Sequence, residues 1–77
     1  MPHVDLKFIT CNLTEEQQNA ISEDIVGVLK KHFGSTDDSV SIRLNEIPKD
    51  DWKGEVYDPI IKANLDKLVK KPGYSMD

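Results

Sequence analysis

Residues 2–9 decide the fold, and they read Pro2-His3-Val4-Asp5-Leu6-Lys7-Phe8-Ile9. Side chains alternate along this stretch, so the even-numbered residues Val4, Leu6 and Phe8 share one apolar face. Positions 3, 5 and 7 carry polar or charged side chains and share the opposite face. This period of two predicts a strand with one drier side, and parity places Pro2 on that side.

A helix is predicted to follow the strand, over about residues 15–33. Its start is the capping box Thr14-Glu15-Glu16-Gln17, in which the threonine hydroxyl and the glutamine amide satisfy backbone groups of the first turn. Apolar residues recur at spacings of three and four from Ile21 to Phe33 and form one stripe. Gly34 stands where a left-handed C-cap residue belongs.

A second alternating stretch, residues 39–47, predicts another strand, which Pro48 ends by removing a backbone donor. Strand, helix and strand within so short a chain form a β-α-β unit with parallel strands. The fold class is therefore α/β.

The rest of the chain predicts a polar loop over residues 48–54 and a second, C-terminal helix. Asp58 is a good N-cap and Pro59 suits the first helical position. We expect this helix to end near Lys70 or Lys71, with a short tail after it.

Composition bounds the function. The 77 residues predict a single domain over 1–77, and the net charge of −4 argues against nucleic-acid and anionic-membrane partners. Cys11 is the only cysteine, so neither an internal disulfide nor a zinc site built from several cysteines can form.

No apolar stretch is long enough to span a bilayer, and we expect a cytoplasmic protein. A two-stranded sheet cannot cover its own edges and faces, which predicts a homo-oligomer.

Pro2 is the candidate catalytic residue. If Met1 is removed, Pro2 becomes a secondary amine, and an apolar setting lowers the pKa of an amine because it disfavours the cation. Such an amine can remove a proton from carbon beside a carbonyl and return it elsewhere. The alternative is that Pro2 has only a structural role, since many chains begin Met-Pro.

Four features together resemble the 4-oxalocrotonate tautomerase family. They are the opening Met-Pro-His-Val-Asp-Leu-Lys, the helix start Leu-Thr-Glu-Glu-Gln-Gln, the strand Ser-Val-Ser-Ile-Arg-Leu-Asn-Glu-Ile, and Trp52 after Pro48. The ending Lys-Lys-Pro-Gly-Tyr-Ser-Met is similar to a dimer-forming bacterial branch described as phenylpyruvate tautomerase-like. The resemblance spans essentially the whole chain. It implies a tautomerase-like subunit whose sheet is completed by oligomerisation, as a dimer or alternatively a hexamer.

The same resemblance implies an isomerase, an intramolecular oxidoreductase that needs no cofactor or metal. It would interconvert the enol and keto forms of a 2-oxo acid such as phenylpyruvate, with Pro2 as general acid and base. The runners-up are another proline-dependent activity, hydration or dehalogenation, and a non-catalytic binding or assembly module.

Three further residues are candidates for substrate binding. Arg43, the only arginine, could grip a carboxylate, although Ser41 stands where the family carries its strand arginine. The two positions share a face about 7 Å apart. Trp52 falls where the family has an aromatic wall beside the proline, and alternatively fastens its loop to the core or to a second subunit. Many members of that family carry a second arginine between the first strand and the helix, where this chain has Cys11-Asn12-Leu13, so binding of the substrate carboxylate must differ or weaken.

Overall fold

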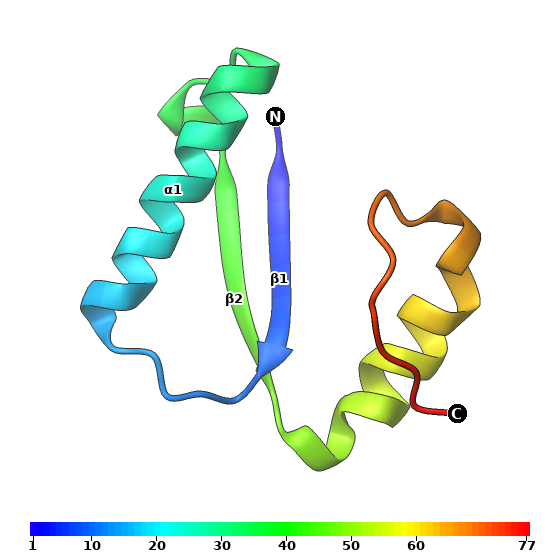
Figure 1. The fold of residues 1–77 in the computed structure, drawn as a ribbon. Coiled ribbons are helices and arrows are strands. Elements are labelled where there is room, and N and C mark those ends of the chain that lie inside the picture. Colours follow the sequence, from blue (N-terminus) through cyan, green and yellow to red (C-terminus); the bar gives the residue numbers. More distant parts are fainter.

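The fold is built on two parallel strands, β1 (His3–Ile9) and β2 (Ser41–Ile47), in a computed structural model that describes all of residues 1–77. The register pairs His3 with Ser41 at one end and Ile9 with Ile47 at the other. The helix α1 (Glu15–Phe33) connects the strands and lies on one side of them, whereas the C-terminal segment lies on the other side (Figure 1). The predicted β-α-β unit is confirmed.

Local signals place both ends of α1. Thr14 and Gln17 form the predicted capping box: the Gln17 N–H donates to the Thr14 hydroxyl at 3.1 Å, and the Thr14 N–H donates to the Gln17 side chain at 2.9 Å. Gly34 adopts the left-handed conformation with φ 66°, which glycine tolerates because it lacks a Cβ. The helix therefore has the predicted bounds.

Two single turns of 3₁₀ helix, η1 (Asp37–Ser39) and η2 (Lys49–Asp51), flank β2. Because η1 occupies Ser39, β2 begins two residues later than the alternation predicts. It ends at Ile47, directly before Pro48, as predicted.

The predicted start of the second helix is wrong. A π-helix, η3 (Lys53–Ile61), already begins at Lys53 and holds Pro59 in its interior. The Lys62 N–H bonds the carbonyl of Tyr57, five residues earlier. A proline cannot donate an α-helical bond and crowds the preceding turn, and a wider turn accommodates both effects. The local N-cap signal at Asp58 is overridden.

The predicted end of this helix is also wrong. A 3₁₀ segment, η4 (Lys62–Lys67), follows η3 directly and contains one non-helical residue, Asn64. The chain leaves helical geometry at Leu68, which is extended at φ −78° and ψ 130°. Residues 68–77 then turn back along η3 and η4 (Figure 1).

The single chain has almost no interior. Only Val56 and Tyr57 are buried, at 4% and 3% exposure, and both belong to η3. The accessible surface is 5929 Å², whereas a compact monomer of 8.7 kDa exposes about 4,700 Å². The radius of gyration is 14.3 Å, against about 11.5 Å expected for this length. The excess, roughly 1,200 Å², exceeds the ~800 Å² that one partner contributes to a standard interface.

No helix in the structure combines the length and the hydrophobicity needed to cross a membrane.

Candidate active site

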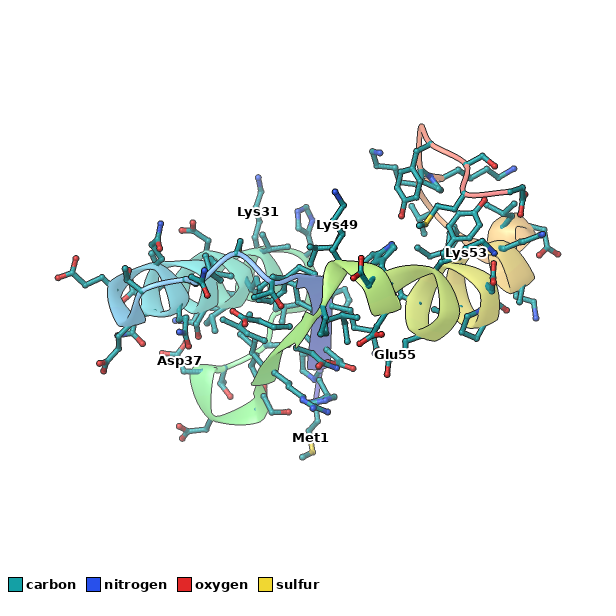
Figure 2. All side chains as sticks on the ribbon, turned by 90° about the horizontal axis from the view of Figure 1, so that it is seen from below. Met1, Lys31, Asp37, Lys49, Lys53 and Glu55 are labelled. Atoms are coloured by element: carbon teal, nitrogen blue, oxygen red, sulfur yellow. The ribbon has the colours of Figure 1, made fainter.

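Pro2 lies at the start of β1 and is partly buried. Its carbonyl accepts a hydrogen bond from the Ser41 N–H at 3.2 Å, which aligns the N-terminus with β2. The Ser41 hydroxyl is hydrogen-bonded to His3 Nδ1 at 2.7 Å. The Met1 side chain is fully exposed and extends away from the fold (Figure 2), so its removal would break no packing. The backbones of two predicted site residues, Pro2 and Ser41, are therefore joined, whereas the Ser41 side chain lies with His3 on the face opposite the one predicted for Pro2.

Arg43 lies two residues after Ser41 on the same polar face of the strand pair, opposite Asp5. A hydrogen bond from Lys7 holds the pKa of Asp5 below its ordinary value of 3.8, and the Lys7 and Arg43 charges add to this effect. Arg43 is exposed and forms no ion pair. The role of Arg43 in binding a substrate carboxylate stays a prediction.

Trp52 lies at the opposite end of the strands, beyond β2. It lines the larger of two cavities, about 740 Å³, together with four other apolar side chains: Phe8, Ile9, Tyr74 and Met76. The Trp52 indole N–H donates to the Tyr74 hydroxyl at 3.1 Å. Trp52 therefore fastens its loop to the C-terminal tail, and bonding of the indole to a substrate oxygen stays a prediction.

Four charged side chains complete the lining of this cavity. Lys7 pairs with Asp5, and Lys53 pairs with Asp58 at 2.9 Å. Lys49 and Asp50 line it without an ion pair. Figure 2 shows Lys49 extending away from the ribbon.

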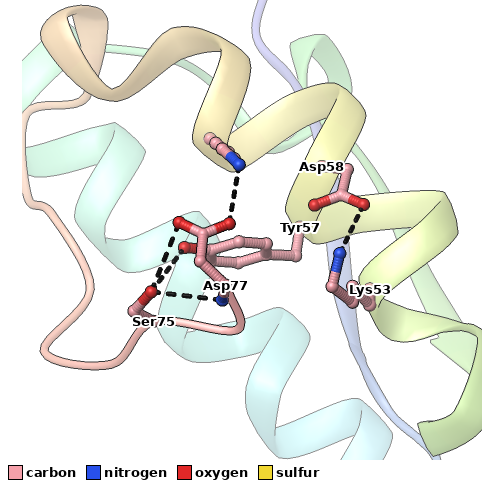
Figure 3. A network of polar contacts seen from close by, with 6 residues as sticks. Lys53, Tyr57, Asp58, Ser75 and Asp77 are labelled. Atoms are coloured by element: carbon pink, nitrogen blue, oxygen red, sulfur yellow. Dashed lines mark hydrogen bonds and ion pairs between the residues drawn. The ribbon is translucent and has the colours of Figure 1, made fainter.

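The C-terminal tail forms one wall of the cavity, and a small polar network holds it on η3 and η4 (Figure 3). Lys62 Nζ donates to Asp77 at 2.6 Å, and the Tyr57 hydroxyl donates to Ser75 Oγ at 3.4 Å. The rings of Tyr57 and Tyr74 pack with centroids 5.9 Å apart. Placement of Tyr74 and Met76 therefore depends on contacts with η3.

Pro2 and Trp52 are not neighbours within one chain. The seven-residue length of the strands separates them, and seven residues span about 20 Å. The polar end with Pro2 and the apolar cavity with Trp52 can form one site only between two chains.

Comparisons with known proteins agree with this fold. The sequence profile of the tautomerase family, described as "Tautomerase enzyme", matches residues 2–56, which include both strands, α1, Pro2 and Trp52. The chain belongs to the tautomerase family. It is therefore an isomerase that acts on a small molecule.

Relatives named Tautomerase PptA match nearly the full length. The protein of Pectobacterium carotovorum subsp. carotovorum (strain PC1) is 63% identical over 75 residues, covering 97% of this chain and 99% of its own. That of Enterobacter sp. (strain 638) is 50% identical over 76 residues, 99% of this chain and all of its own. That of Escherichia coli (strain K12 / DH10B) is 40% identical over 77 residues, covering this whole chain and 99% of its own.

Sequence reasoning missed several cavity residues. It placed Lys49 in a polar loop and residues 74–77 in a short tail, and it assigned neither to a site. The contact between His3 and Ser41 could have been predicted from the pairing of the two strands, because the observed parallel register places these two residues side by side. No sequence signal announces that Tyr74 and Met76 return to Trp52, because that contact depends on how η3 and the tail pack.

Proposed function

We propose that the processed protein interconverts the enol and keto forms of a 2-oxo acid such as phenylpyruvate. Pro2, after loss of Met1, is the general acid and base. The observation that carries this proposal is the placement of Pro2: it is partly buried, tied to β2 through Ser41 and preceded only by an exposed methionine. Membership of the tautomerase family supports it.

The reaction needs only a proton transfer between oxygen and carbon of the substrate. In the ketonising direction, the neutral amine of Pro2 takes the proton from the enol oxygen, and the resulting ammonium delivers a proton to the enol carbon, so that the amine ends neutral as it began. The partly buried position of Pro2 disfavours a charged amine, which supports the neutral form that accepts the first proton. No cofactor is required by this step, and we assign a cytoplasmic location to the protein as part of the same proposal.

The active protein is a homodimer in this proposal. The open shape, the lack of a core and the excess surface support association with a second copy. A two-fold partner with antiparallel strands can set its Pro2 beside the Trp52 cavity of the first chain. Each dimer then holds two sites, each built from both chains.

Pro2→Ala tests the base. We expect its rate of phenylenolpyruvate ketonisation to fall roughly 100-fold or more, because general acid–base catalysis contributes at least this much. The fold should persist, since the Pro2 side chain is only partly buried. A circular dichroism spectrum provides the control for folding. A rate equal to that of the unaltered protein would remove Pro2 from the mechanism.

A mixing experiment tests the shared site. Pro2→Ala and Trp52→Ala proteins are each expected to be weakly active, and mixed dimers should regain one intact site. Random exchange then restores about one quarter of the normal number of sites. Absence of any gain after subunit exchange, with mixed dimers shown by native mass spectrometry, would place both residues in separate functions.

A further inference from the structure

The cavity beside Trp52 has a charged lining to which the catalytic proposal assigns no role. Its volume of about 740 Å³ lies within the range of small-molecule sites. Its apolar wall comes from the end of β1, from Trp52 and from the tail, and these segments place three aromatic side chains and a methionine around the space. Such a wall fits a flat apolar group, and aromatic rings pack well against it.

The charges around the cavity favour an acid. Three lysines line it and only one carboxylate, Asp50, does so. An ammonium group has three donors, so Lys7 and Lys53 retain free donors beyond their ion pairs with Asp5 and Asp58. Lys49 is the lysine whose charge no carboxylate neutralises. A ligand carboxylate therefore has one preferred partner here.

We propose that Lys49 binds the carboxylate of the proposed substrate while the aromatic side of that substrate lies in this cavity. The inference rests on the proposed function, because it names the cation that holds the carboxylate in the same shared site. It also explains how a chain with Cys11 in place of an early arginine holds an acidic substrate. Asp50 opposes the anion and limits its affinity.

Trp52 gives a direct readout because it is the only tryptophan of the chain. Binding of the unreactive acid 3-phenylpropanoate is measured by Trp52 fluorescence and, independently, by titration calorimetry. The protein is the full chain, with Pro2→Ala as a second background. The fold-change in affinity caused by Lys49→Met should be the same in both backgrounds, so a failure of catalysis by Pro2 and a failure of this pocket are distinguished.

Lys49→Met should weaken binding of the acid about three- to tenfold, as expected for one partly solvated charge pair. Lys49→Arg should restore it. The neutral analogue 3-phenylpropan-1-ol should bind Lys49→Met and the unaltered protein equally. Asp50→Asn should tighten binding of the acid about two- to threefold. The matched control is Lys31→Met, in the last turn of α1 and away from the cavity, which should change nothing.

The proposal would be overturned by absence of binding in both methods, by equal affinity of Lys49→Met and the unaltered protein, or by an equal loss in Lys31→Met. It would also be overturned by tighter binding of 2-phenylethylammonium than of the acid. The last result would assign the pocket to a cation held by Asp50. An unresponsive Trp52 with calorimetric binding would place the acid elsewhere and would equally reject the pocket.

Discussion

The helix α1 and the C-terminal segment, residues 53–77, differ in what defines their structure. In α1 every local rule is obeyed, with a capping box, acidic residues in the first turn and a glycine C-cap, yet none of its residues is buried. Val28 and Phe33 remain 56% and 70% exposed. The C-terminal segment breaks local rules, with a proline inside a π-helix, yet it contains both buried residues.

The difference shows where the stability of each region originates. Local hydrogen bonds and helix propensity define α1, and its apolar residues are available for a second chain. Tertiary packing of Tyr57 against the tail defines the C-terminal segment and overrides the helix start encoded at Asp58. Pro2, the proposed catalytic base, belongs to the first, locally encoded half of the chain, whereas the cavity depends on the second half.

The largest effect is expected from Tyr57→Ala. Removing this buried ring should lower the free energy of unfolding by about 3–5 kcal/mol, because the cavity left behind adds to the lost transfer energy. Urea denaturation followed by circular dichroism measures it. Tyr57→Phe keeps the ring and serves as the control. A loss below about 1 kcal/mol for Tyr57→Ala would show that packing in this segment is not the dominant contribution.

Thr14→Ala tests the locally encoded helix. Loss of the cap should lower the free energy of unfolding by about 1 kcal/mol, because the Gln17 N–H loses its acceptor. Thr14→Ser retains the hydroxyl and should recover most of this loss. If both variants lost equal stability in urea, the capping box would not be what secures α1.

Asp77→Asn should loosen the tail slightly. Lys62 donates a hydrogen bond that holds the pKa of Asp77 below its ordinary 3.8, and Asp77 raises the pKa of Lys62 above 10.5. The ion pair therefore contributes its full stabilisation between pH 3.8 and pH 10.5, the ordinary pKa values of the two groups. It is lost as pH falls through the lowered pKa of Asp77 or rises through the raised pKa of Lys62.

Amide hydrogen exchange of residues 74–77 measures this attachment. Asp77→Asn should speed exchange only about two- to threefold near neutral pH, since the ion pair is exposed. Asp66→Asn, which removes an unpaired carboxylate of η4, is the control and should leave exchange unchanged. Equal acceleration in both variants would show that the tail is held by other contacts.

The smallest effect on stability is expected from Tyr74→Phe. Loss of the hydroxyl frees the Trp52 indole N–H, which then bonds water, and the free energy of unfolding should change by no more than about 0.5 kcal/mol. Trp52 emission should shift nevertheless, because its polar partner changes. An unchanged emission maximum would contradict the Trp52–Tyr74 contact.

The sequence predicts the β-α-β half nearly to the residue because its signals are local. Alternation specifies β1, and Thr14 and Gly34 bound α1. The tautomerase family also follows from motifs in this half. The start of η3 and the return of Met76 to the cavity could not be predicted, since they depend on contacts between residues far apart in the chain. That Lys49 lines the cavity could not be predicted for the same reason.

The most direct test of the central claim compares the chain with and without Met1. With Met1 attached, the Pro2 nitrogen is an amide and has no basic lone pair. The two forms are separated, identified by intact mass and assayed for ketonisation of phenylenolpyruvate. We predict that the Met1-free form carries essentially all of the activity. Equal rates for the two forms would contradict the assignment of Pro2 as the catalytic base.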